Sequence, residues 1–450
     1  MEKRIVILGA GPTGLGAAYR LRELGYRNWL IYEKNDYIGG LAASFKDDQG
    51  FTWDIGGHVM FSHYKYFDDV VDKLLGDDYL EHQRESWIRM LQRWVPYPLQ
   101  NNIRHLPKEA VLECLVGLHE AARNTHEPAR NFHEWILSTF GEGIAKHFMF
   151  PYNKKLWRTP LDKMDKSWIA ERVSVVDFEK ALNNVILAKD DTGWGPNNVF
   201  KFPLKNGTGG LFGRFLPYIE DNLRIYADAV KIDLEQKRIW FADGATDTYD
   251  ILINTSPLDS LIGKSSAPEE VRQAAGNLIS NSVYVVGVGL DKKLQSSKCW
   301  IYFPDSSAPF YRVTQFSNYS PFNVPSGDRE RFSSFMCETS FSKDVSVGKE
   351  TIIEKTVKGL IDNRMMEPGD EKLIAGTYLI EVDRAYPVPT IGRDRALTDI
   401  QDFLHANSVY SRGRFGAWRY EIGNMDHSVM MGAECVGSIL NGEKEAVFES

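Results

Sequence analysis

The chain has 450 residues, of which 43% are hydrophobic and 25% charged, and its formal net charge at pH 7 is −8. These values are ordinary for a globular protein, and the length predicts two or three structural units. No basic run or stripe interrupts the acidic balance, so nucleic acid is not an expected partner. The N-terminus lacks a signal-peptide pattern and no stretch reaches membrane-spanning length, which favours a cytoplasmic protein without a membrane partner.

The chain begins with a pattern that is typical of dinucleotide binding. Residues 4–8, RIVIL, predict a buried strand, and Gly9, Gly11 and Gly14 follow it as GxGxxG at the start of an amphipathic helix. Such glycines permit a tight turn, a close approach of pyrophosphate and close packing of helix on strand. A second strand ends at Glu33, where a carboxylate can bind the adenosine ribose hydroxyls. Together these features predict a Rossmann-like βαβ unit.

A second glycine pair distinguishes FAD from NAD. Gly39 and Gly40 follow Glu33 after six positions in EKNDYIGG, a pattern that resembles FAD proteins of the glutathione-reductase-like superfamily, the branch that contains the amine oxidases. The resemblance implies that this pair lets the backbone pass close to FAD. FAD is therefore the predicted cofactor.

A further glycine pair precedes a histidine and a dense aromatic run. In FTWDIGGHVMFSHYKYF, Gly56 and Gly57 leave the backbone nearly bare directly before His58. Bare backbone is useful where a flat object lies against it. We expect that object to be the isoalloxazine ring, with His58 against its face or edge.

Cysteines and histidines do not show metal-binding patterns. The four cysteines are scattered without a CxxC pair, which predicts free thiols in a reducing compartment. His63 and His82 are not spaced to bind a metal together with His58. No metal site is predicted. The cysteines are Cys114, Cys299, Cys337 and Cys435.

The rest of the chain predicts an α/β protein with a helical insertion and a second sheet. Residues 86–103 alternate like a strand pair, residues 107–150 have helical periodicity, and apolar strands recur after residue 200. The C-terminal part predicts a strand, a glycine loop and a helix. We therefore expect a discontinuous FAD-binding domain, a helical substrate domain and a mostly antiparallel substrate sheet. Their predicted ranges are 1–85 with 200–265 and 390–450, then 104–199, then 86–103 with 266–389.

Five loops together resemble one family. GGHVMFSHYKYFDD, WVPYPLQNNI, NVILAKDDTGWGPNN, FYRVTQFSNYSPFN and GRFGAWRYEIGNMDHS occur in the order seen in UDP-galactopyranose mutases of the eukaryotic type. The resemblance runs from the N-terminus to near residue 437, which is nearly the whole chain.

The resemblance implies a set of site residues. His58, Arg172 and Arg312 are implied as catalytic, the two arginines because they contact the substrate diphosphate. Arg414, Gly423, Asn424 and Met425 match the loop near the flavin, and Gly57 also belongs to the flavin contacts. The implied substrate contacts are Tyr302, Tyr319, Tyr386 and Tyr420 at the phosphates, Tyr97, Gln100, Phe148 and Tyr152 at the nucleoside, and Asn153, Trp157 and Asn197 at the sugar.

The resemblance also implies an isomerase without net redox change. Reduced flavin N5 attacks the anomeric carbon of UDP-galactopyranose, and the sugar returns as UDP-galactofuranose. Covalent catalysis of this kind uses the cofactor as the nucleophile. NADPH or another reductant is implied as the electron donor, and a glycoconjugate or cell-wall pathway as the destination of the product.

Three alternatives remain open at the level of sequence. An amine-oxidase-like oxidase or desaturase would explain residues 1–58 equally well, and a non-catalytic FAD protein would share the fold. A mutase for another sugar nucleotide, such as a GDP-linked deoxysugar, is the third, because Leu99 stands beside Gln100 where related sequences often carry an aromatic residue. The oligomeric state is not predicted.

Overall fold

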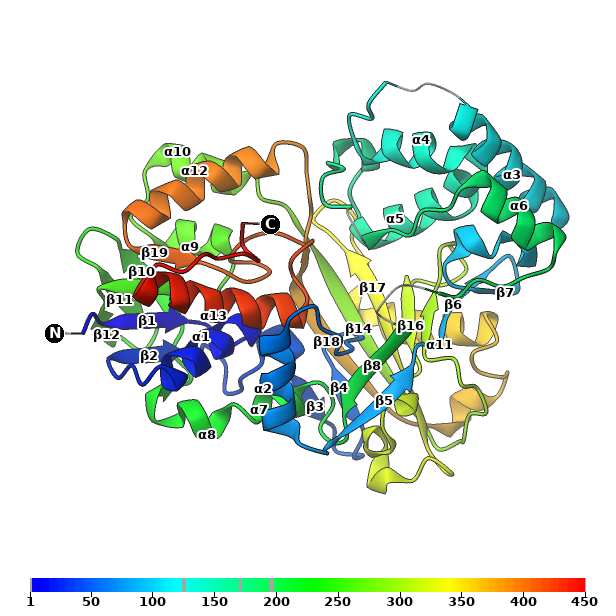
Figure 1. Cartoon of the computed structure of the whole chain (residues 1–450). Helices are drawn as coiled ribbons and strands as arrows, with labels where there is room; N and C mark the ends of the chain where they lie inside the picture. The colour runs from blue at the N-terminus through cyan, green and yellow to red at the C-terminus, as the bar shows by residue number, and fades with distance from the viewer. Residues whose placement is uncertain (1, 124–126, 170–171, 194–197, 450) are drawn as a thin grey trace.

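The computed structural model describes residues 2–123, 127–169, 172–193 and 198–449 (Figure 1). Five strands of the structure form a parallel sheet in the order β19-β13-β1-β2-β9. Their bounds are β1 Ile5–Leu8, β2 Trp29–Tyr32, β9 Leu223–Arg224, β13 Ile251–Asn254 and β19 Val409–Ser411.

Alternate side chains of β1 pack against helices on the two opposite faces of this sheet. Ile5 and Ile7 pack into one apolar core with helices α1 and α13, whereas Val6 and Leu8 pack into another with α9, α10 and α12. All four side chains are buried, as expected for a strand covered on both faces. The helix bounds are α1 Pro12–Glu23, α9 Leu258–Lys264, α10 Glu269–Gly276, α12 Arg393–Ala406 and α13 Met425–Asn441.

A second sheet of seven strands has the order β18-β14-β17-β16-β15-β6-β7. Its pairs are antiparallel except for β15 and β6, which run parallel. Val283 and Val285 of β14 face the core shared with the helical region, and Val286 and Val288 face α11. The bounds are β6 Ser86–Met90, β7 Arg93–Pro96, β14 Ser280–Leu290, β15 Trp300–Tyr302, β16 Arg312–Thr314, β17 Ser333–Phe341, β18 Ile374–Pro387 and α11 Ile352–Asp362.

Four helices that follow β7 in the chain form the helical region that the sequence predicts. Figure 1 shows them gathered at the end of the molecule away from the five-stranded sheet. They pack with one face of the seven-stranded sheet in a single apolar core, which joins this region to the sheet. Their bounds are α3 Lys108–Arg123, α4 Phe132–Ile144, α5 Phe150–Trp157 and α6 Phe178–Ile186.

Smaller elements complete the described chain. Strands β3 and β4, β5 and β8, and β10 to β12 form three small antiparallel sheets. Their bounds, with the remaining helices, are β3 Ser44–Lys46, β4 Thr52–Asp54, α2 Lys65–Leu75, β5 Tyr79–Gln83, β8 Val199–Pro203, α7 Gly209–Gly213, α8 Leu216–Ile219, β10 Ala229–Asp233, β11 Arg238–Phe241 and β12 Thr246–Thr248.

The predicted fold class is confirmed, because a Rossmann-like unit, a helical insertion and a mostly antiparallel sheet are all present. The exact boundaries between the three parts stay a prediction. All four cysteines are buried and free. Among the described residues, none of the helices combines the length and the apolar character that a membrane crossing requires.

Candidate functional site

A cavity of about 490 Å³ lies at the carboxyl end of β1, where the GxGxxG sequence was predicted to bind a dinucleotide. Gly9 adopts a positive φ of 98°, and a Cβ on Gly14 would lie 1.9 Å from the Gly9 carbonyl oxygen. Only glycine fits this approach of helix to strand. Helix α1 begins after Gly11 without a side-chain cap from the described residues, so its first amide groups remain for an anion.

Glu33 lies in the wall of the same cavity and is held by the backbone. Its Oε2 accepts a hydrogen bond from the Ala10 amide at 2.8 Å, and its Oε1 accepts one from the Asn35 amide at 2.9 Å. The carboxylate therefore has a fixed position beside the glycine turn. An uncapped helix and a fixed carboxylate fit the pyrophosphate and the ribose of FAD.

A larger cavity of about 810 Å³ lies between the seven-stranded sheet and the helical region. The two cavities share part of their walls, and His58 and Arg414 belong to both. A ligand as long as FAD can thus reach from the nucleotide cavity to the edge of the larger one. The remaining shared residues are Leu41, Ile55, Val382 and Met425.

The backbone before His58 is bare because strand β16 and Glu338 lie against it. Gly56 has a φ of 88°, and a Cβ on Gly57 would lie 2.6 Å from Thr314 Oγ1. His58 is half-buried, and its Nδ1 atom is buried without a hydrogen-bond partner among the described residues. Burial, followed by the charge of Arg414, lowers the pKa of His58 to about 4, so the imidazole is neutral near pH 7.

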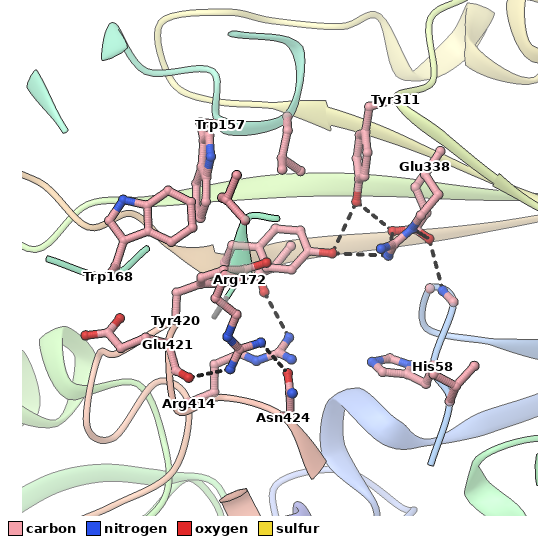
Figure 2. Close-up of a pocket in the computed structure, with 18 of the residues that line it drawn as sticks. His58, Trp157, Trp168, Arg172, Tyr311, Glu338, Arg414, Tyr420, Glu421 and Asn424 are labelled. Carbon is pink, nitrogen blue, oxygen red and sulfur yellow. Dashed lines mark hydrogen bonds and ion pairs between the residues drawn. The ribbon is translucent and has the colours of Figure 1, made fainter. Parts of the chain in front are cut away.

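Arg312 is held by a buried carboxylate in the wall of the larger cavity (Figure 2). Its Nε and Nη2 donate to the two oxygens of Glu338 at 2.7 and 2.6 Å. The Tyr311 hydroxyl donates to Glu338 at 2.6 Å and the Gly57 amide donates at 3.0 Å. Burial opposes the ionised carboxylate, but the charge of Arg312 and these hydrogen bonds keep the pKa of Glu338 below its ordinary value. The ion pair therefore stays charged.

Arg172 also belongs to the wall of the larger cavity. Its guanidinium donates to Asn424 Oδ1 at 2.9 Å and to the Glu421 carbonyl oxygen, and it lies 5.5 Å from the centre of the Tyr420 ring. Arg172 and Arg312 line the same cavity, and Figure 2 shows Arg172 beside Arg414 in it, with Glu338, the partner of Arg312, farther along the wall. Since the hydrogen bonds of Arg172 go to neutral oxygens, it keeps an uncompensated positive charge for an anionic ligand.

Aromatic side chains form much of the remaining wall. Tyr97 stacks on Tyr302 with ring centres 4.8 Å apart, and Phe148 stacks on Tyr152 at 5.5 Å. Nearby, Gln100 donates to the Ser174 carbonyl oxygen, while its Oε1 is buried and unpartnered among the described residues. Flat rings and a free acceptor suit a nucleobase.

Most of the predicted site residues line one of the two cavities. Gly14, Gly39 and Tyr319 do not, and Asn197 lies outside the described residues. Gly39 supports the nucleotide cavity by donating its amide to Ala10, and the Tyr319 ring packs against Phe202. The predicted residues that line only the nucleotide cavity are Gly9, Gly11, Glu33, Gly40 and Gly423. Those that line only the larger cavity are Gly57, Tyr97, Gln100, Phe148, Tyr152, Asn153, Trp157, Arg172, Tyr302, Arg312, Tyr386, Tyr420 and Asn424. The residues that line both are His58, Arg414 and Met425.

Sequence reasoning missed several residues in the wall of the larger cavity. A signal existed for Glu338, because a carboxylate inside the apolar strand SSFMCETSF needs a partner when it is buried. A signal also existed for Tyr311, which precedes Arg312. The missed residues are Arg84, Trp168, Trp300, Tyr311 and Glu338.

His63 lies near Asp426 and His427 rather than near His58 or His82. The ligand atoms of these three residues lie within 4.8 Å of one another in the wall of the larger cavity. The carboxylate accepts hydrogen bonds from both imidazole rings, at 2.9 and 3.1 Å. The three side chains satisfy one another, so their arrangement does not require an ion.

Comparison with known proteins by sequence finds the nucleotide-binding part. Residues 7–74 match the family of NAD(P)-binding Rossmann-like domains. A 15-cis-phytoene desaturase from Synechococcus elongatus is 33% identical over 85 residues, which are 19% of this chain and 18% of the desaturase. The alignment thus covers less than a fifth of the length of this desaturase, and it supports only the FAD-binding fold.

Comparison with solved structures covers the whole chain. A crystal structure titled reduced UDP-galactopyranose mutase aligns with a TM-score of 0.96 and 43% identity, over 100% of this chain and 96% of that one. A putrescine oxidase bound to putrescine aligns with a TM-score of 0.67 and 16% identity, over 98% of this chain and 99% of that one. The second likeness concerns the fold alone.

Proposed function

The chain belongs to the UDP-galactopyranose mutase family, and from this premise we propose that it interconverts the pyranose and furanose forms of a nucleoside diphosphate sugar. UDP-galactopyranose and UDP-galactofuranose are the substrate pair that the proposal favours. FAD is the cofactor, held by the glycine turn and Glu33 in the nucleotide cavity.

One observation carries the proposal. The FAD cavity meets the larger cavity at His58, and the arginines in the wall of the larger cavity include Arg172 and Arg312, which come from different parts of the chain. Two guanidinium groups match the two phosphates of a nucleoside diphosphate. An oxidase that acts on an uncharged or cationic substrate has no use for them.

The groups around the cavity have separate roles in such a reaction. Reduced FAD, when bound, supplies the nucleophile for the anomeric carbon and recovers its electrons, so that no net redox change occurs. Arg172 and Arg312 stabilise the negative charge on the diphosphate, which is greatest as the glycosidic C–O bond breaks. The hydroxyls of Tyr302, Tyr386 and Tyr420 add hydrogen-bond donors on rigid rings.

Neutral His58 suits the sugar rather than the phosphates. Because its pKa lies near 4, it carries no charge that would compete with the arginines for the diphosphate. Its free Nδ1 can hydrogen-bond a sugar hydroxyl during ring opening and closure. Apolar and aromatic side chains exclude water, which would otherwise hydrolyse an activated sugar.

The nucleobase is proposed to be uracil. The unpartnered Oε1 of Gln100 can accept a hydrogen bond from a base N–H, and the stacked pairs nearby accept a flat ring. Leu99, which motivated the alternative of a GDP-linked sugar, is fully buried and does not belong to the cavity wall. Leucine in place of an aromatic residue at position 99 therefore supplies no contact that would favour guanine.

The test is incubation of the dithionite-reduced protein with a panel of UDP- and GDP-sugars, followed by chromatography for furanose products. We expect UDP-galactofuranose to be converted to UDP-galactopyranose, with the reverse reaction at lower yield. Release of hydrogen peroxide in step with substrate loss, without any furanose or pyranose product, would assign the protein to the oxidases instead.

A further inference from the structure

Glu338 is the most heavily hydrogen-bonded carboxylate beside the larger cavity. It is 1% exposed, and it lies directly opposite Arg312 in the antiparallel ladder of β16 and β17. Its Oε1 accepts from the Gly57 amide and Arg312 Nε, and its Oε2 accepts from Arg312 Nη2 and the Tyr311 hydroxyl. The position of the carboxylate is therefore determined by the register of the sheet.

These four donors leave Glu338 little capacity for a substrate. A carboxylate offers about four lone-pair sites, and the two oxygens already accept two hydrogen bonds each. The strong ion pair also keeps it from acting as a general acid. Any effect of Glu338 on turnover must therefore pass through the groups that it holds.

The groups on either side of Glu338 belong to two different parts of the proposed reaction. Gly57 precedes His58, which lies where the FAD cavity meets the substrate cavity. Arg312 faces the proposed diphosphate, and its plane is also fixed by the Trp300 ring, whose centre is 4.5 Å from the guanidinium carbon. Nη1 of Arg312 has no hydrogen bond within the described chain and remains for a phosphate oxygen.

We propose that Glu338 is a positioning residue that fixes Arg312 relative to the Gly56–His58 loop, and thereby sets the distance between the departing diphosphate and the reacting sugar carbon. The inference rests on the proposed mutase function. It predicts that Glu338 contributes to turnover and not to ground-state affinity for the nucleotide, because Arg312 binds phosphate with or without its partner.

Two substitutions separate position from charge. Glu338→Gln keeps the length of the side chain but removes its charge, whereas Glu338→Asp keeps the charge but shortens the side chain, so that it cannot reach both Gly57 and Arg312. If only charge matters, the aspartate variant retains wild-type turnover. If position matters, both variants are slow, by about tenfold to a hundredfold for a misplacement near 1 Å.

Glu445→Gln is the matched control. Glu445 is also a buried carboxylate, and its two oxygens accept hydrogen bonds from Nε and Nη2 of Arg412. It lies outside both cavities. Its substitution should lower the melting temperature and leave kcat unchanged. It therefore shows what the loss of a buried ion pair does by itself.

The experiment measures kcat, KM, the dissociation constant for UDP, FAD content and melting temperature for the wild type and the three variants. Support requires a fall in kcat for both Glu338 variants, with UDP affinity equal to or tighter than that of the wild type and with normal FAD content. Wild-type kcat in either Glu338 variant overturns the inference. A joint loss of kcat, UDP affinity and FAD, beyond that of Glu445→Gln, also overturns it, because it indicates a structural role.

Failure of the proposed function gives a different result. In that case the reduced wild-type protein converts none of the sugar nucleotides, and the inference falls with the function. If the wild type isomerises a sugar nucleotide and the Glu338 variants match it, only the inference falls.

Discussion

Burial determines the charge that His58 carries at the junction of the two cavities. The imidazole has no carboxylate partner of its own in the described chain, and the nearby cations Arg414 and Arg312 oppose a third positive charge. The neutral form is therefore present in the folded protein over the whole range in which an exposed histidine titrates. This has a measurable consequence for the pH dependence of both turnover and stability.

We predict that turnover shows no ionisation of His58 between pH 5.5 and 8, and that stability falls with acid. The folded-state pKa of His58 is about 4 and the ordinary value is 6.5, so the unfolded chain binds more protons between these values. The contribution of His58 is present above pH 6.5 and is lost as the pH falls toward 4, by about 3 kcal/mol. Thermal melts of the wild type and His58→Ala from pH 4 to 8 measure it.

The alanine variant should also fold and bind FAD but turn over slowly. If the difference between the two melting temperatures does not change with pH, His58 is not buried as described. If the variant turns over like the wild type, His58 has no part in the reaction.

Arg172 and Arg312 should be needed for turnover but not for FAD binding. A charge-assisted hydrogen bond contributes about 1.5–3 kcal/mol, so Arg172→Ala and Arg312→Ala should each lose about tenfold to more than a hundredfold in kcat/KM. Arg312→Lys should lose less, because it keeps the charge but not the forked contact with Glu338. Steady-state kinetics with FAD quantified by absorbance measure both effects, and normal kinetics in both alanine variants would place the diphosphate elsewhere.

Residues whose role follows from their sequence neighbours could be predicted, and residues whose role depends on distant partners could not. Gly57 and His58 stand in one motif, so their place at the cavity was predicted from it. Glu338 is 26 positions from Arg312 and 281 from Gly57, and only the folded sheet brings the three together. Tyr319 was implied at the phosphates by resemblance, yet its hydroxyl is buried without a partner from the described residues and outside the cavity wall.

At the scale of elements, the contact of helix α1 with the turn that follows strand β1 depends on a missing side chain. A Cβ on Gly14 would lie 1.9 Å from a backbone oxygen, which cannot move as the end of a flexible side chain can. We therefore predict that Gly14→Ala displaces the start of α1 and costs about 1–3 kcal/mol, with loss of FAD. Melting temperature and FAD content measure the effect.

Gly263→Ala is the matched control for this element. Gly263 lies in helix α9, and a Cβ there would meet no described atom within 4 Å. Alanine favours a helix over glycine by about 0.5–1 kcal/mol, so this variant should be as stable as the wild type or more stable. Retention of FAD and stability by Gly14→Ala would show that the glycine turn is not the close contact described here.

Strand pairs that are adjacent in sequence were predictable, whereas the order of strands in the large sheet was not. Residues 86–103 were predicted to contain a strand pair, and β6 and β7 indeed pair, with Trp87 opposite Pro96. The parallel contact of β6 with β15 joins residues more than two hundred positions apart, with Trp87 opposite Ile301. Local alternation contains no information about such a partner.

At the scale of the whole molecule, the two cavities meet because distant parts of the chain converge on one wall. Leu41 and His58 come from the N-terminal part, Val382 from the last strand of the large sheet, and Arg414 from the loop before α13. The order of motifs predicted that a FAD part and a substrate part exist. Their connection through a shared wall is a property of the fold, and under the proposed function it links the redox state of FAD to a substrate that is not itself oxidised.

The redox state should therefore switch the activity of the whole protein. As isolated in air, the protein should be yellow with one non-covalently bound FAD per chain and should not isomerise sugar nucleotides, because oxidised flavin is a poor nucleophile. Reduction by dithionite should start turnover, and many turnovers should follow one reduction because the reaction has no net redox change. NADPH should be tested beside dithionite as an enzymatic source of the same electrons. Anaerobic product analysis against the number of electrons added measures this directly. One product molecule per reduction, or activity in the oxidised protein, would exclude a mutase and favour the oxidases that share its fold.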